Sequence, residues 1–315
     1  MKTIKESAVL TVAAIRRPGS EGITKYLFNE RQQFFQLREG IKSAEGPSKL
    51  LRQALEKKLP VKALLDSRGA TIEKVEFPQR GEIEEFKRCR ILLEKPEKPT
   101  RVDVKAIDPT SFNIVGRHLK CPIFRRCTRV VPNYKAAKKI FEFCASQSCH
   151  LGGPFSISPC IPFQYVRDGC YARAHKMRWI ITTKYRYCCE KVFSFANHGN
   201  DELAVKADKW GGCCVTWWYH VAPLVRVRIN LGFANVVLAF VIDPGMFDHP
   251  VLLSSWLSAQ QSSVCSPNAH VSMYSIQPGS AYSPAGYAGT TFTTDPSYTA
   301  TDATLTAYHS LTTCP

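Results

Sequence analysis

The sequence predicts an α+β protein in two units, and three observations support this prediction. The 315 residues exceed the usual size of one compact domain. Residues 1–130 hold 28 Lys and Arg against 16 Asp and Glu, whereas residues 131–315 hold 14 against 10. Ten of the 13 cysteines lie after residue 140. The two parts therefore differ in charge and cysteine content, and each mixes helical with strand-like patterns.

Composition argues against several classes of partner. No apolar run approaches the ~18 residues that a membrane span needs, so we expect no membrane contact. Basic and acidic residues are interleaved in the N-terminal part, without the clustered basic stripe of a nucleic-acid surface. No C-x-x-C pair occurs, and the adjacent pairs Cys188-Cys189 and Cys213-Cys214 do not suit a tetrahedral zinc site. We therefore predict no nucleic-acid partner, no metal and no organic cofactor.

The cysteines indicate disulfides and an oxidising compartment, so we expect a secreted protein. We expect Cys149 to pair with Cys160, and Cys189 to pair with Cys213 or Cys214. Because the number of cysteines is odd, at least one thiol stays unpaired in a monomer, which is the state that we expect.

The N-terminal part begins with an apolar block at residues 8–15. This block is short for a signal peptide and lacks a small-residue cleavage site, so we expect a strand there. An export signal, if there is one, would lie outside this sequence. Residues 33–37 are predicted to be extended. The clearest helix covers residues 47–59, where leucines recur at helical spacing, Ser48 can cap the start and Pro60 can end it.

Further along, residues 61–67 are predicted to form a strand, and residues 81–94 a helix or a helix followed by a strand. Residues 91–130 are rich in Pro, Lys and Arg without sustained periodicity, which is typical of a linker. Its arginines, Arg125, Arg126 and Arg129 among them, would be targets for a trypsin-like protease.

The C-terminal part continues with predicted helices at residues 133–146 and 170–183, followed by strands at residues 215–229 and 236–243. From about residue 250 the chain is rich in Ser, Thr, Ala and Tyr. We expect this tail to form a surface of loops and short strands that cysteines hold in place.

One segment has the pattern of a nucleophile. Gly169 is a turn residue, and Cys170 follows it at the start of a predicted helix. The helix dipole and the free N–H groups of a first turn favour a thiolate, and the same N–H groups can stabilise an oxyanion. A cysteine at a helix start can equally be a half-cystine or a core residue.

A nucleophile needs a base, and two histidines compete for that role. His175 lies five residues along the helix, which turns its side chain away from Cys170 by about 140°. His220 lies in a strand, and Asp243 at the end of the next strand could orient its ring. The order of nucleophile on a helix, base on a strand and orienting residue on the next strand is that of papain and transglutaminase. Gln164, six residues before Cys170, has the spacing of an oxyanion-hole glutamine.

These residues closely resemble the bacterial secreted protein-glutaminase (protein-deamidase) family. The matching segments around the nucleophile are residues 158–161 (SPCI), 168–178 (DGCYARAHKMR), 189–191 (CEK), 213–215 (CCV), 219–222 (YHVA) and 242–244 (IDP). Residues 130–149 resemble the start of the mature enzyme, and residues 50–66 and 70–76 resemble its pro-region.

The resemblance implies an α+β fold with a papain/transglutaminase-like cysteine hydrolase core, inhibited by a small α+β pro-domain. We divide the chain into an inhibitory pro-domain (1–115), a processing linker (116–129) and a catalytic domain (130–315). The implied reaction converts protein-bound glutamine to glutamate with release of ammonia. The implied partners are proteins and peptides with exposed glutamine, and an activating protease.

The implied triad is Cys170, His220 and Asp243. Backbone N–H groups near Gly169 and Cys170 would hold the oxyanion, and Trp218, on the same strand face as His220, could line the cleft. Trp217 would then face away from His220. A cysteine protease or a transglutaminase would use the same triad, and a disulfide-rich binding protein would use none of it.

The pro-region contains a candidate substrate mimic in residues 31–37 (RQQFFQL). It resembles the inhibitory segment of the family, which aligns Gln33 with the residue presented to the nucleophile, and Gln32 is a close competitor. With Phe34, these residues are predicted to occupy the active site, held out of near-attack geometry so that they escape turnover. The alternative is an ordinary strand with Phe34 or Phe35 in its core.

Overall fold

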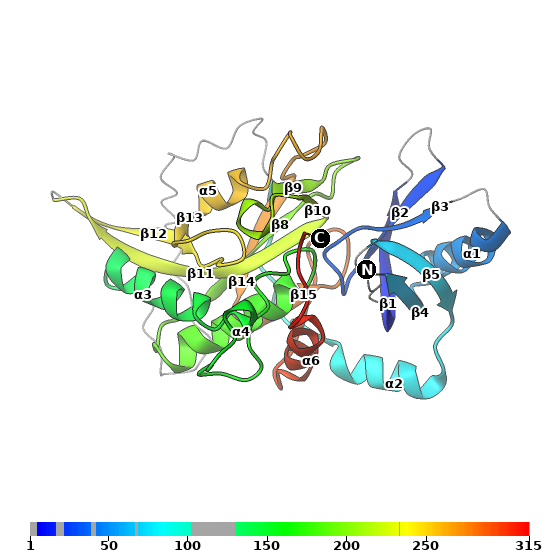
Figure 1. Cartoon of the computed structure of the whole chain (residues 1–315), viewed down its shortest axis with the longest axis horizontal. Coiled ribbons are helices and arrows are strands. Elements are labelled where there is room, and N and C mark those ends of the chain that lie inside the picture. Colours follow the sequence, from blue (N-terminus) through cyan, green and yellow to red (C-terminus); the bar gives the residue numbers. More distant parts are fainter. Residues whose placement is uncertain are drawn as a thin grey trace.

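The structure is a computed structural model that describes residues 5–16, 22–38, 42–66, 69–101, 130–232 and 234–314. It has the predicted α+β class. Figure 1 shows a smaller N-terminal unit, coloured blue to cyan, beside a larger unit coloured green to red. The predicted processing linker, residues 116–129, lies outside the described residues.

The N-terminal unit is a closed five-stranded barrel with two helices. Its strands follow one another around the barrel in the order β1 (Lys5–Arg16), β2 (Ile23–Phe28), β3 (Phe35–Arg38), β5 (Thr71–Glu76) and β4 (Pro60–Asp66). The helices are α1 (Lys42–Lys57) and α2 (Arg80–Cys89). Alternate side chains of β4 point into the barrel, where Val61, Ala63 and Leu65 are buried.

Helix α1 starts earlier than its sequence predicts. Ser48 does not cap it, because the helix already begins at Lys42 and contains Pro47. Proline removes one helical hydrogen bond, but Ala44 in the added turn is buried in the barrel core. Packing therefore outweighs the local signal. Pro60 marks the end as predicted, since it is the first residue of β4.

The larger unit is built on a six-stranded sheet. Its strand order is β13 (Val251–Leu252), β12 (Asn235–Val241), β11 (Tyr219–Asn230), β8 (Glu190–Phe195), β14 (Met273–Pro278) and β7 (Thr100–Arg101). Two small sheets accompany it, β10 (Cys214–Trp217) with β9 (Leu203–Lys206), and β15 (Ala281–Pro284) with β16 (Phe292–Thr294) and β6 (Ile91–Leu92). Its helices are α3 (Tyr134–Ala145), α4 (Cys170–Thr183), α5 (Leu253–Ser258) and α6 (Thr299–Tyr308).

Strands β6 and β7 correct the prediction of a linker from residue 91 onward. Both come from the N-terminal half of the chain, yet β6 pairs with β16 and β7 pairs with β14 of the larger unit. Two-residue edge strands are held by backbone hydrogen bonds, so they need no apolar periodicity that a sequence could display. The two short strands at residues 91–92 and 100–101 thus belong to the sheets of the larger unit.

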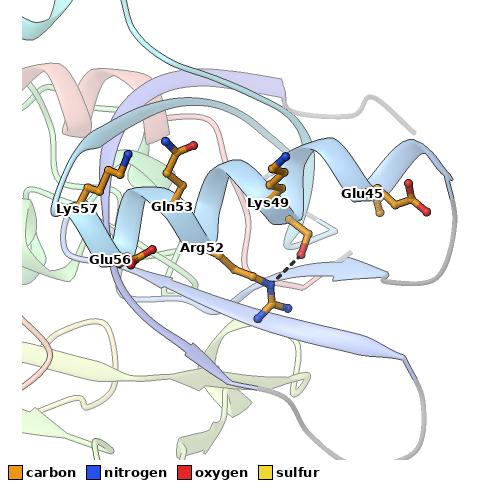
Figure 2. A pocket seen from close by; sticks show the side chains of 8 residues that line it. Glu45, Lys49, Arg52, Gln53, Glu56 and Lys57 are labelled. Carbon is orange, nitrogen blue, oxygen red and sulfur yellow. Dashed lines mark hydrogen bonds between the residues drawn. The ribbon is translucent and has the colours of Figure 1, made fainter.

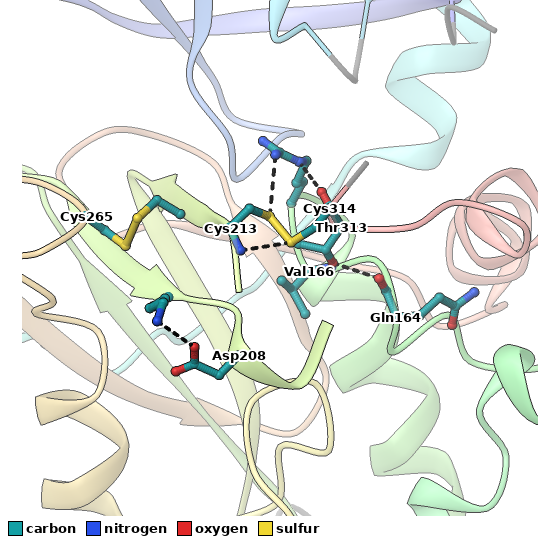
Figure 3. Close-up of a disulfide and its surroundings, with 10 residues drawn as sticks. Gln164, Val166, Asp208, Cys213, Cys265, Thr313 and Cys314 are labelled. Carbon is teal, nitrogen blue, oxygen red and sulfur yellow. Dashed lines mark hydrogen bonds and ion pairs between the residues drawn. A yellow bond between two sulfur atoms is a disulfide. The ribbon is translucent and has the colours of Figure 1, made fainter. Parts of the chain in front are cut away.

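The disulfides match the predictions in one case and not in the other. Cys149 pairs with Cys160 as predicted. Cys213 pairs instead with Cys314, and Cys214 with Cys265. Neighbouring residues of an extended chain point in opposite directions, so the adjacent cysteines reach different parts of the C-terminal tail. Figure 3 shows both bridges.

The expected pairing of Cys189 is therefore wrong. Cys189 is a buried free thiol, as are Cys144 and Cys170, whereas Cys188 is disulfide-bonded. No helix among the described residues is long and apolar enough to cross a membrane.

Candidate active site

Cys170 is the first residue of α4 and is almost completely buried. Gly169 before it has a left-handed backbone with φ of 80°, and a Cβ at this position would lie 2.9 Å from the Tyr308 ring. Only glycine fits both the turn and the contact. Asp168 is also buried, accepts a hydrogen bond from Tyr308 Oη at 3.0 Å, and lies 3.4 Å from Arg31 Nε.

The sulfur of Cys170 faces β11. The backbone N–H of Val221, the residue after His220, donates to it. Burial raises the pKa of the Cys170 thiol well above its usual value, and the nearby Arg173 only partly opposes this effect. In this form of the protein the sulfur is therefore a thiol rather than a thiolate at neutral pH.

His220 and Asp243 form a buried pair. His220 Nε2 lies 2.9 Å from Asp243 Oδ2, and Trp256 Nε1 donates to the same oxygen at 2.9 Å. Burial alone would raise the pKa of Asp243, but the charge and hydrogen bonds of His220 and Trp256 hold it below its usual value. The carboxylate is thus ionised and accepts from Nε2–H. His220 Nδ1 has no hydrogen-bond partner in the described part of the chain.

The ring of His220 lies between two indoles. Trp217 stacks on it at 4.6 Å and 14°, and Trp256 at 5.3 Å and 24°. The prediction that Trp217 faces away is wrong, because the chain bends at Trp218 between β10 and β11 and the strand alternation restarts there. The sequence did not indicate a role for Trp256. It lies on α5, where Leu253, Trp256 and Leu257 have the i, i+3, i+4 spacing that could have revealed a helix.

His175 lies away from this pair. Its Nε2–H donates to the carbonyl oxygen of Asp295 at 3.0 Å, and its Nδ1 accepts from Lys191 Nζ at 2.7 Å. Burial, together with the neighbouring Lys191, lowers the pKa of His175 to about 2. Both ring nitrogens therefore have hydrogen-bond partners in the core. This agrees with the helical spacing, which turns His175 away from Cys170.

A side chain from the N-terminal unit fills the space beside Cys170. Gln32 is completely buried, and its Oε1 accepts from the backbone N–H of Cys170 at 2.9 Å. Its Nε2 donates to the carbonyl oxygen of Val166 at 3.0 Å. Its backbone N–H donates to Asp168 Oδ1 at 3.1 Å, and its carbonyl oxygen accepts from the Trp218 N–H at 3.0 Å.

The neighbours of Gln32 contact other parts of the cleft. Gln33 makes an isolated backbone bridge with Trp217. Phe34 is buried between the units, with the cations of Arg16 and Lys25 over its ring at 5.4 and 5.3 Å. Gln32, rather than Gln33, therefore presents its amide to Cys170.

Trp218 contacts the segment that carries Gln32, since its indole N–H donates to the carbonyl oxygen of Arg31 at 2.7 Å. Of the groups predicted to hold an oxyanion, Gln164 and the Gly169 N–H have other partners in this form of the protein. The side chain of Gln164 donates to the carbonyl oxygen of His309 at 2.8 Å. The backbone carbonyl oxygen of Gln164 accepts from Thr313 Oγ1 of the C-terminal tail (Figure 3). The Gly169 N–H is engaged by the carboxylate of Asp168. The Cys170 N–H, which was named with them, donates to the amide oxygen of Gln32.

A shallow recess lies on the surface of α1, lined by polar and charged side chains such as Glu45, Arg52 and Glu56 (Figure 2). None of the candidate site residues lines it. Among the described residues, no group of three His, Cys, Asp or Glu is placed to hold a metal ion. Cys170 is buried, and the equally buried Gln32 lies against it.

Comparison with known proteins assigns the family. A family model described as glutaminase matches residues 137–260. The fold is similar to a crystal structure of pro-protein-glutaminase, with a TM-score of 0.71 and 29% identity over 99% of this chain and 94% of that one. A mutant of pro-protein-glutaminase gives a TM-score of 0.70 and 30% identity over 97% of this chain and 93% of that one.

Protein-glutaminase from Chryseobacterium proteolyticum is 34% identical over 59% of this chain and 92% of its own length, with a TM-score of 0.51. A comparison with curated protein sequences gives no match. The chain belongs to the protein-glutaminase family and corresponds to its proenzyme form.

Proposed function

We propose that this chain is the precursor of a secreted hydrolase that converts glutamine side chains of proteins and peptides to glutamate and ammonia. One observation carries the proposal. A glutamine carboxamide lies with its oxygen on the backbone N–H of Cys170, and the sulfur of Cys170 accepts from the N–H of Val221, the residue after His220. Family membership makes this reaction the expected one.

In the proposed reaction the Cys170 thiol gives its proton to His220 Nδ1, and the sulfur attacks the side-chain carbonyl carbon of glutamine. Nδ1 suits this role because Nε2–H is engaged by Asp243, which leaves Nδ1 as the accepting nitrogen. Trp217 and Trp256 restrain the ring on both faces. The N–H of Cys170 stabilises the oxyanion that develops.

Breakdown of the tetrahedral intermediate requires a proton on the departing nitrogen, and His220 supplies it. Ammonia leaves and a thioester with Cys170 remains. Water, activated by the same imidazole, then hydrolyses the thioester to glutamate and the free thiol. The arrangement of helix α4, strand β11 and the end of strand β12 is consistent with a papain/transglutaminase-like core.

The N-terminal unit acts as the inhibitory pro-domain, with Gln32 in the place of a substrate glutamine. Its burial of Cys170 leaves no room for a second amide. The proposed catalytic domain, residues 130–315, is 59% of the chain, the same share that protein-glutaminase covers. Cleavage in the linker 116–129 by an activating protease would separate the units. The disulfides support an oxidising, extracellular location.

A peptide-cleaving protease with the same triad would bind a backbone carbonyl at the Cys170 N–H. Here the atom at that position is a side-chain amide oxygen, whereas the backbone carbonyl of Gln32 is bound by Trp218. This difference favours deamidation over peptide hydrolysis.

The proposal is tested by incubating the trypsin-processed chain with a glutamine-rich protein. We expect free ammonia without chain cleavage or crosslinking, and none from the Cys170→Ala variant processed in the same way. Fragments would indicate a protease, crosslinked species a transglutaminase, and no change a binding protein.

A further inference from the structure

We propose that Gln32 is itself a substrate of Cys170, and that the intact precursor converts Gln32 to glutamate in one intramolecular turnover. This inference rests on the proposed deamidase function. It concerns a modification of the chain by its own active site, before or without cleavage of the linker.

The orientation of the Gln32 amide follows from its partners. A backbone N–H can only donate, so the atom 2.9 Å from Cys170 N is the amide oxygen. A backbone carbonyl can only accept, so the atom 3.0 Å from Val166 O is the amide nitrogen. The oxygen therefore lies at the helix N-terminus that would stabilise negative charge, and the future leaving group points the other way.

The backbone of Gln32 is fixed on both sides of the amide. Asp168 accepts its N–H, and the N–H of Trp218 donates to its carbonyl oxygen. A mimic escapes turnover when its amide is displaced from the reacting groups. The 2.9 Å contact with the Cys170 N–H shows no such displacement of the amide oxygen. The amide oxygen therefore lies on the N–H group that would hold the carbonyl oxygen of a substrate.

The chemical steps balance with water as the only co-reactant. His220 takes the thiol proton, the sulfur of Cys170 bonds to the side-chain carbon of Gln32, and the carbon–nitrogen bond breaks as His220 returns the proton to the departing ammonia. Water then adds to the thioester and the carbon–sulfur bond breaks, which restores the thiol and leaves glutamate at position 32. Because Cys170, His220 and Gln32 are all buried, entry of water limits the second half of the reaction.

The product would bind less well than the amide it replaces. The new carboxylate would place an acceptor against the carbonyl oxygen of Val166, where the amide nitrogen now donates. It would also bring a second negative charge close to Asp168, which already contacts the same residue. Loss of a satisfied hydrogen bond and burial of a charge both weaken the hold of the pro-domain. Self-deamidation would thus prepare the precursor for release.

The direct test follows residue 32 in the uncut, full-length chain. The purified precursor is incubated in buffer, and the peptide that contains residues 32–36 is examined by mass spectrometry over time. We expect Gln32 to become glutamate while Gln33 and Gln36 in the same peptide stay unchanged. The Cys170→Ala precursor should keep all three glutamines. Hydroxylamine added during the incubation should convert residue 32 to the hydroxamate, since it intercepts the thioester.

The outcomes separate this inference from the proposed function. If Gln32 stays a glutamine in the wild-type precursor, while the processed chain releases ammonia from an added protein, self-deamidation is wrong and the deamidase function stands. If the processed chain releases no ammonia, the function itself fails. Deamidation of Gln32 in the Cys170→Ala chain would also overturn the inference, because it would be spontaneous.

A pair of variants tests the consequence. In the Cys170→Ala background, which keeps residue 32 as introduced, the cut N-terminal fragment of the Gln32→Glu variant should dissociate from the larger unit about tenfold faster, or more, than the fragment that carries Gln32. In the same background, Gln36→Glu makes the same change in charge on β3, outside the contacts with Cys170, and should dissociate at the rate of the Gln32 parent. Equal rates for the two variants would contradict the proposed weakening.

Discussion

The surroundings of Cys170 explain why its sulfur is shielded from external reagents in the precursor and should become accessible to them after processing. Its thiol is buried under Gln32, and this burial raises its pKa well above the usual value. Removal of Gln32 would admit water and leave the helix N-terminus and Arg173 to favour the thiolate. The same side chain that blocks substrate thus also keeps the nucleophile protonated.

The pH dependence of Cys170 alkylation by iodoacetamide should therefore change when the precursor is processed. A thiol with a raised pKa forms thiolate only at high pH, so Cys170 in the precursor should react slowly at neutral pH. After removal of the pro-domain the profile should shift to lower pH. Peptide mapping measures the modification. Cys189, whose pKa burial raises to about 12, should stay unreactive in both forms and serves as the internal control. Equal profiles for Cys170 in the two forms would contradict the argument.

Asp243→Asn should lower kcat strongly, by a factor of about 100 to 10,000, and leave a measurable remainder. An asparagine can donate to His220 Nε2, which moves the ring proton to Nδ1 and removes the base that faces the thiol. The attacking thiol and the oxyanion donor remain. Steady-state ammonia release from the processed chain gives the ratio. An unchanged kcat would show that Asp243 does not set the tautomer.

At the scale of elements, α5 contacts the proposed catalytic pair through Trp256. Trp256→Phe removes the N–H that donates to Asp243 and keeps an aromatic ring against His220. Loss of a hydrogen bond to a charged group is expected to lower kcat about tenfold. The acid limb of the pH profile should also move, because Asp243 loses a donor that holds its pKa down. A change in KM alone would indicate a structural role instead.

The C-terminal tail is joined to the site by the bridge between Cys213 and Cys314, which are 101 residues apart in sequence. Loop entropy predicts that this bridge stabilises by about 4–5 kcal/mol, against about 3 kcal/mol for the bridge from Cys149 to Cys160. Replacing both cysteines of the first bridge by serine should thus lower the free energy of unfolding more than replacing both of the second. Urea unfolding followed by tryptophan fluorescence reports on the catalytic part, since all five tryptophans lie after residue 170. The reverse order would contradict the loop-entropy argument.

At the scale of the whole molecule, the two units share more than the segment around Gln32. Strands β6 and β7 pair with strands of the larger unit, and Lys25 forms a half-buried ion pair with Glu202. Cutting the linker therefore does not remove the contacts that keep the pro-domain in place.

Limited trypsin treatment should consequently produce a nicked complex that elutes as one species in size-exclusion chromatography. Ammonia release should lag behind cleavage and rise as the N-terminal fragment dissociates or is degraded. Gel electrophoresis and the activity assay on the same time points compare the two rates. Full activity at the moment of cleavage would mean that the linker itself, rather than the docked unit, holds the enzyme inactive.

The local sequence alone determined the start of α4 at Cys170 behind a glycine, the orientation of His175 away from it, and the order of the helix and strands that carry Cys170, His220 and Asp243. These features depend on helical and strand periodicity and on the backbone freedom of glycine, which act over a few residues. The disulfide between Cys149 and Cys160 could be predicted for a similar reason, since its two cysteines lie close together in the sequence.

Only the tertiary structure decided which glutamine faces Cys170, where Gln164 points, which partners Cys213 and Cys214 take, and that Trp256 supports Asp243. Each of these depends on how segments that lie far apart in the chain meet in the folded state. A bend of one residue at Trp218 is enough to exchange the two faces of a strand, and local periodicity carries no record of it. The proposed chemistry of this protein could therefore be predicted from short motifs. Its proposed inhibition by the N-terminal unit depends on contacts that exist only after the two units have packed together.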